Sequence, residues 1–461
     1  MSINFSAFEI GRRALNANQA GISITGQNIA NVNTPGYSRQ RVQLVESAPM
    51  HFNGYSVGNG VTIAGVQDFR DNFIESRLQT ETGIAGRLNA RRDALAPVEA
   101  TLQGSENGGL QNSLNNFFAA FRDLEANPNS VALRASVAQK GAGIANAFQT
   151  TRGRLGEIQL GTDGQIRAKL EQANSLSEKI ADLNLKIQTS EATGGIASGL
   201  RDQRGEYAKQ ISEITGARAT QNSDGTLTVT IGEGRPLVSG EKAFRLTVTN
   251  TPPLGLSSIA IDGQPAVFDE GSIRGLQEAL AETSKQIGTL DGLAASVVSR
   301  VNILHTSGTD LDGNAGIKFF DDSTTPVTAA NIKINAAITA NPRLVVASPL
   351  NQPGQTGTVA GAIANLLTDQ TSTVNSQTGS FSSIFSSMIS LAGEQVRTAD
   401  DALQTQSAII SQLSAQRESV SGVSLDEEAI NLMQYQKAYE AAARFMKIAD
   451  EMTQTILSLA Q

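Results

Sequence analysis

Residues 26–37 read "GQNIANVNTPGY", and this stretch decides where the N-terminal helix of the chain ends. Thr34 precedes a proline, which disfavours the α-helical backbone conformation, and Pro35 has no N–H group with which to continue a helix. Gly36 accepts a positive φ, so the four residues that end at Tyr37 have the sequence of a type II turn. The helix is therefore predicted to stop at this corner.

The residues before the corner carry a repeat of large apolar side chains. Its members, seven residues apart, are Phe8, Leu15, Ile22 and Ile29. Ser6 and Glu9 have the spacing of a capping box, so we expect a helix of about 24 residues that ends near Asn31. The second line of the repeat is Gly11, Asn18 and Thr25, so only half of a coiled-coil seam is apolar. Such a helix needs neighbours, and the amides of Asn28 and Asn31 are placed to bond its last carbonyls or a neighbouring chain.

The end of the chain carries a second heptad pattern, over residues 424–460. One line is Leu425, Leu432, Tyr439 and Met446, and the other is Tyr435, Ala442, Ala449 and Ile456. Ser424 and Glu427 have the spacing of a capping box, and the acidic residues after Leu425 place negative charge at the helix N-terminus. The apolar lines favour an interaction role for this helix over a merely solvated face.

The sequence pattern in the middle of the chain changes several times, between strand-like, helical and turn-rich segments. Residues 39–66 alternate apolar and polar side chains, as in strands and loops, and 68–216 are helical in pattern. Breaks at "GSENGG", "ANPNS" and "GTDG" predict about four or five antiparallel helices there. Residues 217–268 are β-branched alternating runs, which predict a small antiparallel sheet. Helical patterns resume over 272–305 and 360–419, whereas 307–357 are rich in turns.

The predicted fold is mainly α with an inserted β domain. Terminal helices form a coiled-coil axial domain, followed by a long-helix bundle and a small antiparallel β domain. The predicted divisions are an axial and linker part at 1–66 with 420–461, a helical bundle at 67–216 with 272–306 and 358–419, an inserted β domain at 217–271, and a turn-rich segment at 307–357.

The composition argues against several functional classes. The chain of 461 residues has a formal net charge of -8, without the clustered Lys and Arg that a nucleic-acid binder needs. It has no cysteine and two histidines, His51 and His305, so disulfides, thiolate nucleophiles and Cys-ligated metals are excluded. No apolar run of about 18 residues and no signal peptide are evident. The ordinary expectation is a cytoplasmic protein, unless another export route recognises the chain.

Both ends of the chain resemble signatures of the bacterial flagellar axial proteins, a group of rod, hook and hook-associated members. "NIANVNTPGYSRQ" at 28–40 resembles the N-terminal signature, and "SGVSLDEEAINLMQYQKAYEAAARFMKIADEM" at 421–452 resembles the C-terminal one. The motif residues at the corner are Asn28, Asn31, Asn33, Pro35, Gly36 and Tyr37. Three internal stretches, at 199–212, 225–240 and 301–320, are similar to the hook-associated members that join hook to filament.

The resemblance implies a non-enzymatic structural subunit, exported unfolded by the flagellar secretion apparatus and assembled in a ring between hook and filament. The implied partners are other copies of the chain, the hook protein, the next hook-associated protein on the filament side and an export chaperone. It implies an extracellular location without a cleavable signal peptide, and no cofactor, nucleic acid or membrane insertion. The residues expected to serve assembly or chaperone binding are Leu425, Leu432, Tyr435, Tyr439, Ala442, Met446 and Ala449.

Two alternatives concern single motifs. "DLDGNAGIKFFD" at 310–321 places oxygen ligands as a calcium loop does, but Ala315 stands where such a loop needs glycine and Asp321 replaces its glutamate. A solvated turn is the simpler reading. His305 near Thr306 and Ser307 suggests a catalytic relay, yet nothing specifies the orienting carboxylate that a relay needs, so a helix-end or packed histidine is expected.

Three wider alternatives remain. "SGEK" at 239–242 fits the loose S-x-x-K pattern, and a hairpin turn is expected there instead. The chain is alternatively another axial protein, such as a hook or filament subunit. The most distant alternative is a surface adhesin or peptidase on a flagellar-like scaffold, which requires a catalytic centre within 217–357.

Overall fold

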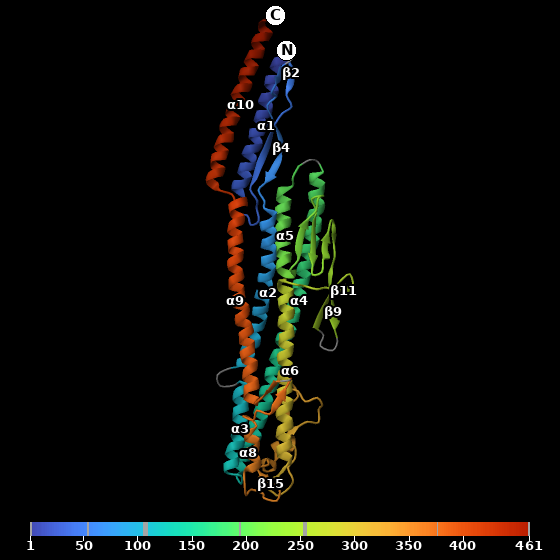
Figure 1. Ribbon diagram of the computed structural model, residues 1–461, viewed down its shortest axis with the longest axis vertical. Helices are drawn as coiled ribbons and strands as arrows, with labels where there is room; N and C mark the ends of the chain where they lie inside the picture. The colour runs from blue at the N-terminus through green and yellow to red at the C-terminus, as the bar shows by residue number, and fades with distance from the viewer. Residues whose placement is uncertain are drawn as a thin grey trace.

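The computed structural model describes residues 2–52, 55–104, 109–192, 195–251, 256–375 and 377–459. It is a long rod of helices with small antiparallel sheets along one side (Figure 1). The two ends of the described chain lie at the same end of the rod. The fold is mainly α with an inserted β region, as predicted from the sequence.

The terminal helices α1 (Ser2–Ala30) and α10 (Leu425–Leu459) lie side by side at one end of the rod (Figure 1). α1 ends where the corner was predicted to end it. It begins before Ser6, however, so the predicted capping box is wrong, and the Glu9 carboxylate instead pairs with Arg12 at 2.9 Å.

Two antiparallel ribbons follow α1. Strand β1 (Gln40–Glu46) pairs with β4 (Val61–Asp68), and β2 (Met50–Phe52) pairs with β3 (Tyr55–Val57). The register of the longer pair shifts at one bulge between Gln43 and Leu44. β1 and β4 contact α1, so α1 lies between this ribbon and α10 (Figure 1).

Long helices form the body of the rod. They are α2 (Asn72–Gln103), α3 (Leu110–Ala126), α4 (Val131–Glu191), α5 (Ser198–Thr215), α6 (Gly271–Thr306) and α9 (Phe381–Ser421). The predicted break at "GTDG" is wrong, because residues 161–164 lie inside the single helix α4, which is 61 residues long. Packing of α4 against its neighbours overrides the weak helix propensity of these glycines.

The β region between α5 and α6 contains two sheets. One is four-stranded, with β5 (Arg218–Gln221), β6 (Leu227–Ile231), β7 (Arg235–Ser239) and β8 (Lys242–Ala243) in order. The other has the order β11 (Gln264–Pro265), β10 (Leu256–Ile261) and β9 (Leu246–Thr251). All pairs are antiparallel. The hairpin expected at "SGEK" is confirmed, since Ser239 pairs with Lys242.

Short elements fill the end of the rod opposite the two chain ends, which we call the distal end (Figure 1). They are β12 (Gly308–Thr309), β13 (Phe320–Asp321), β14 (Lys333–Ile334), α7 (Ala336–Ala340), η1 (Pro342–Leu344), β15 (Ser348–Pro349), α8 (Thr358–Asn365), β16 (Ser372–Val374) and β17 (Gln377–Gly379). A helix over 360–419 was predicted. The observed chain instead ends α8 at Asn365 and makes the β16–β17 hairpin before α9 begins.

The rod has two hydrophobic cores. The distal core joins α3, the first half of α4, the second half of α6, the start of α9 and the turn-rich segment, around phenylalanines such as Phe117 and Phe319. The proximal core joins α2, the second half of α4, α5, the first half of α6 and both β-sheets. α6 runs through both cores. It is long and apolar enough to cross a membrane by length and composition, but half of its most apolar window is buried inside the protein.

Candidate functional site

The corner after α1 has the geometry predicted from its sequence. The Tyr37 N–H donates to the Thr34 carbonyl at 3.2 Å, and Gly36 has a φ of 80°. These features confirm the type II turn. The Asn31 side chain donates to the carbonyl of Gln27 at 2.9 Å, so it satisfies the end of α1 as expected.

Asn28 connects three segments beside this corner. Its amide nitrogen donates to the Gln40 carbonyl at 2.9 Å and to the Glu428 carboxylate at 3.0 Å. Its amide oxygen accepts from the Tyr37 hydroxyl at 2.8 Å and from the Gln40 N–H at 3.0 Å. The side chain is only 1% exposed, and both donors and both acceptor positions are used. The Asn28 amide is therefore fully used in hydrogen bonds to three segments of the chain.

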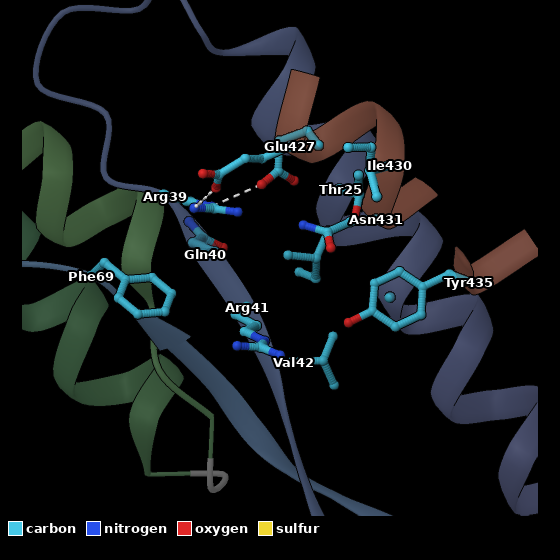
Figure 2. Close-up of a pocket in the computed structure, with 13 residues that line it drawn as sticks. Thr25, Arg39, Gln40, Arg41, Val42, Phe69, Glu427, Ile430, Asn431 and Tyr435 are labelled. Atoms are coloured by element: carbon cyan, nitrogen blue, oxygen red, sulfur yellow. Dashed lines mark hydrogen bonds and ion pairs between the residues drawn. The ribbon is translucent and has the colours of Figure 1, made fainter. Parts of the chain in front are cut away.

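Glu428 brings the start of α10 into the same network. Its side chain is 2% exposed and accepts from Arg39 Nε at 2.8 Å. The same guanidinium reaches Glu427 at 2.7 Å, and Figure 2 shows Arg39 beside Glu427. Glu427 was predicted to cap α10, but its carboxylate pairs with Arg39. The burial of Glu428 is tolerated because the carboxylate is both paired and hydrogen-bonded.

A second carboxylate holds the other side of the corner. Asp202, on α5, accepts from the Ser38 N–H at 3.1 Å and pairs with Arg70. Burial raises the pKa of this carboxyl, although Arg70 opposes the shift. Burial, with the charges of Asp202 and Glu428, also raises the pKa of Tyr37 to about 12. Tyr37 therefore stays a neutral hydrogen-bond donor to Asn28.

α9 contributes the third support. The Arg417 guanidinium donates to the Gly36 carbonyl at 2.9 Å and pairs with Glu75 of α2 at 2.6 Å. The Arg39 N–H donates to the Ser421 carbonyl at 3.0 Å. The corner is thus fixed to α2, α5, α9 and α10, and it sets how the axial pair of helices leaves the body of the rod.

The contact between α1 and α10 uses small residues. A Cβ atom added at Gly11 would lie 2.3 Å from the Met446 sulfur, and one added at Gly21 would lie 2.6 Å from the Tyr435 ring. The buried residues of α1 are Gly11, Ala17, Gly21, Thr25 and Asn28. The predicted seam residues Phe8, Leu15, Ile22 and Ile29 are half-buried in the single chain, and their assignment as a seam stays a prediction. The two helices approach closely because the side chains of α1 on this face are small.

α10 has a second apolar face that its own chain leaves open. Its residues, exposed by two fifths to three fifths, are Ile430, Met433, Phe445, Ile448, Met452 and Ile456. Within 430–433 and within 445–456 the steps are three or four residues, and the two groups are twelve residues apart, so all lie on one broad side of the helix. Buried or half-buried residues at Tyr435, Ala442, Met446 and Ala449 occupy the side toward α1. Within the described chain, nothing covers the outer stripe.

A groove opens where α1, β1 and the start of α10 meet, and Figure 2 shows its lining. Its volume is about 440 Å³, and its walls include Ile24, Arg41, Val42, Phe69 and Tyr435. The groove mixes apolar walls with the Arg39 ion pairs. It carries no cluster of three or more metal-ligating side chains, and neither does any other region that the structure describes.

Some of the predicted site residues lie in the corner network and others lie outside it. Asn28 and Tyr37 meet in the corner network, whereas Asn33 is exposed outside it. On α10, Leu432 is half-buried, Tyr439 is 38% exposed and Leu425 is 52% exposed. Sequence reasoning missed Arg39, Gln40, Asp202, Arg417 and Glu428, which complete the network. The only local signal was the run of polar residues around each, since their partners are distant in sequence.

The alternative motifs have other uses. Asp310 accepts hydrogen bonds from the backbone of its own turn at 2.8–2.9 Å, and Asp312 pairs with Arg343. Asp321 pairs with Lys333 at 3.0 Å, so these carboxylates do not converge on one point as a calcium loop requires. His305 is fully buried, with Nδ1 bonded to the Ile317 carbonyl and Nε2 accepting from the Val346 N–H. It is a packed histidine, as expected. The side chain of His51 lies outside the described residues.

Comparisons with known proteins agree with this architecture. Residues 95–320 match the family model "Flagellar hook-associated protein FlgK helical domain". Residues 8–37 match the flagella basal body rod protein family, and 415–459 match the C-terminal family of flagellar basal body rod FlgEFG proteins. By these matches the chain is similar to bacterial flagellar axial proteins at both ends and in its helical body.

Within that class the chain is a relative of flagellar hook-associated protein 1. It is 27% identical to that protein of Bacillus subtilis (strain 168), over 99% of each chain. It is 26% identical to that protein of Salmonella typhimurium, over 96% of this chain and 98% of the relative. The fold matches the flagellar hook junction protein FlgK from Burkholderia pseudomallei with a TM-score of 0.66 and 14% identity, covering 75% of this chain and all of that one. The role of the chain is that of a structural component of the flagellar axis.

Proposed function

We propose that the protein is the subunit of a ring that joins hook to filament, and that it has no enzymatic activity. The part proposed to form the axis is 1–66 with 420–461, and the remaining helices and sheets form the outer body. The observation that carries the proposal is the outer stripe of α10, defined by Ile430, Met433, Phe445, Ile448, Met452 and Ile456.

The outer stripe favours a contact with another copy of the chain. α1 already covers one face of α10, and the stripe lies on a different face, so the chain cannot bury it by closing further on itself. An exposed apolar stripe of this length marks a protein interface in a soluble subunit. A helix presented in this way suits packing against helices of adjacent subunits around a common axis.

The proposed partners follow from the relatives. The names of these relatives, hook-associated protein and hook junction protein, support the hook as one partner. The other proposed partners are the next hook-associated protein on the filament side and an export chaperone before assembly. We propose that the chain is exported unfolded by the flagellar secretion apparatus, without a cleavable signal peptide, and works outside the cell. A chain without cysteine is compatible with passage through a narrow channel, because no disulfide has to open.

The proposal is tested by introducing one negative charge into the outer stripe. Ile448→Asp should leave the helical content and melting temperature of the purified monomer unchanged, because this side chain is 55% exposed. In cells it should permit export of the protein but prevent filaments from staying on hooks. Gln436→Asp is the matched control, since it adds the same charge at an exposed position of α10 outside the stripe. Normal filaments with Ile448→Asp, or equal loss with both variants, would refute the role of the stripe.

A further inference from the structure

The two hydrophobic cores of the rod separate at one level. In α4 no fully buried apolar residue lies between Leu155 of the distal core and Ile166 of the proximal core. In α6 the corresponding gap runs from Leu280 to Ile287. We call this level the waist, and define it by residues 96–97 of α2, 156–165 of α4, 281–286 of α6 and Gly393 of α9.

Contacts between the helices place these segments together. The Gln159 side chain of α4 donates to the Ser284 hydroxyl of α6 at 2.8 Å. A Cβ atom added at Gly393 of α9 would lie 3.0 Å from the Glu99 carboxylate of α2, two residues beyond Pro97. The waist is therefore a cross-section of the whole bundle and not a feature of one helix.

The interior of the waist is polar. Its buried side chains are Gln159, Thr162, Asp163, Thr283 and Gln286. Gln286 bonds to Glu282 of its own helix at 3.1 Å, and Asp163 accepts from the Ser257 N–H of β10 at 2.6 Å. Between α4 and α6 few apolar side chains interlock at this level, so their packing is weaker here than in either core. In α2 the cores stay close, since Leu95 and Val98 are three residues apart.

Each helix is also weakened where it crosses the waist. Pro97 lies inside α2 and lacks the N–H that would continue the helical ladder. The hydroxyls of Thr162, Thr283 and Ser284 bond the carbonyls four residues before them, a bond that often bends helices. In α4 four glycines fall within twelve residues, at Gly153, Gly156, Gly161 and Gly164.

These four glycines are not required by packing. A Cβ atom at Gly153, Gly161 or Gly164 would meet nothing within 4 Å, and one at Gly156 would meet only the end of Arg152. Some helical glycines elsewhere in the rod do have a packing reason: a Cβ atom at Gly86 would lie 2.2 Å from a backbone carbonyl, and one at Gly275 would lie 2.1 Å from another. Exposed glycines inside a helix lower its stability and stiffness without any gain in contact.

We infer that the waist is a bending point, at which the distal half of the rod tilts relative to the half that carries the β-sheets and the axial helices. Three features coincide there: a gap between the two cores in α4 and α6, a polar interior between these helices, and a helix-weakening residue in each of α2, α4 and α6. The inference goes beyond the proposed junction role. It divides the outer body into two rigid parts joined at the flexible waist. The distal part can then tilt while the axial helices α1 and α10 stay fixed.

Spin-label distances in the full chain test the inference. The chain has no cysteine, so Asn116→Cys on α3 and Lys209→Cys on α5 give two exposed labelling sites, one in each half. The distance distribution between the labels should be broad. Gly153→Ala, Gly161→Ala and Gly164→Ala, introduced together, should narrow it, because alanine stiffens the helix and the space for each methyl group is open.

The control replaces glycines that are equally exposed but lie away from the waist. Gly26→Ala, Gly143→Ala and Gly199→Ala also meet nothing within 4 Å and should leave the width unchanged. Hydrogen exchange gives a second readout: amides of 156–165 should exchange faster than those on either side in α4, and the waist variant should remove the difference. Equal widths in parent and waist variant, equal narrowing by the control, or uniform exchange along α4 would each overturn the inference.

Discussion

Asn28 and Glu428 lie 400 residues apart in the chain, and the amide of the first donates to the buried carboxylate of the second at 3.0 Å. The bond fixes the end of α1 to the start of α10 at the point where both leave the body of the rod. It is central to the predictions that follow, because the corner, the axial pair and the outer body all meet there.

Asn28→Leu should loosen the axial pair. Leucine has a similar volume but makes none of the four hydrogen bonds, so the Glu428 carboxylate, the Tyr37 hydroxyl and the Gln40 backbone lose a partner. We expect a local cost of about 3 kcal/mol. Hydrogen exchange of α1 and α10 should accelerate, while the two cores keep their protection. Asn33→Leu, at an exposed position outside the network, is the control and should change neither.

Gly36→Val should strain the corner without disturbing the cores. A Cβ atom at Gly36 meets only Glu206, at 3.6 Å and beyond, so space is not the obstacle. The obstacle is the φ of 80°, which costs a β-branched residue on the order of 1–3 kcal/mol. The melting temperature should hold, and cells should export the protein but fail to retain filaments. Asn31→Leu should act in the same direction more weakly, because it removes one bond and permits the turn. Full motility with Gly36→Val would contradict this account.

Charges at Leu432 and Tyr439 test the proposed chaperone contact. Both flank the face of α10 that meets α1, and Tyr439 remains 38% exposed. Leu432→Asp with Tyr439→Asp should weaken binding to the export chaperone in a pull-down with purified proteins, and should impair assembly as well. Binding at parental strength would place the chaperone contact elsewhere. The Gln436→Asp chain serves as the charge control here too.

His305 predicts an acid-sensitive distal core. Burial lowers its pKa from 6.5 to about 4, with the Arg134 charge as a further cause. The unfolded chain takes up a proton below pH 6.5, whereas the folded chain resists protonation down to about pH 4. Stability should therefore fall as the pH drops through this window, by up to about 3 kcal/mol from this group. Urea unfolding of His305→Gln should show a shallower pH slope between these limits. An unchanged slope would mean that other groups set the acid response.

The sequence predicted what local chemistry determines. The end of α1, the type II turn and the hairpin at "SGEK" each depend on residues adjacent in the chain, and each was predicted correctly. The partners of Asn28 could not be predicted in the same way, because Glu428 becomes its neighbour only when the chain ends meet. The seam predicted at Phe8 and Leu15 stays a prediction. The contact of α1 with α10 inside the chain lies at Gly11 and Gly21, where a larger side chain would meet Met446 or Tyr435.

The continuity of α4 is a second example in which local sequence did not predict the structure. Gly161 and Gly164 predict a break by propensity, and tertiary packing on both sides keeps the helix whole. The prediction erred about the interruption but marked the right place, because the waist lies at these glycines. Residues of low helix propensity inside a long helix thus indicate where the helix is flexible, which the secondary structure alone does not show.

The pairing of the first and last helices also bears on quality control during synthesis. α1 is made first and has to wait for α10, so Gly11 and Gly21 stay uncovered until the end of the chain exists. A product that stops before residue 425 can complete both cores and yet lacks Glu428 for Asn28 and the whole outer stripe. We expect a fragment of this kind to keep both cores and yet to be unable to join the proposed ring, because it has no α10 to pair with α1.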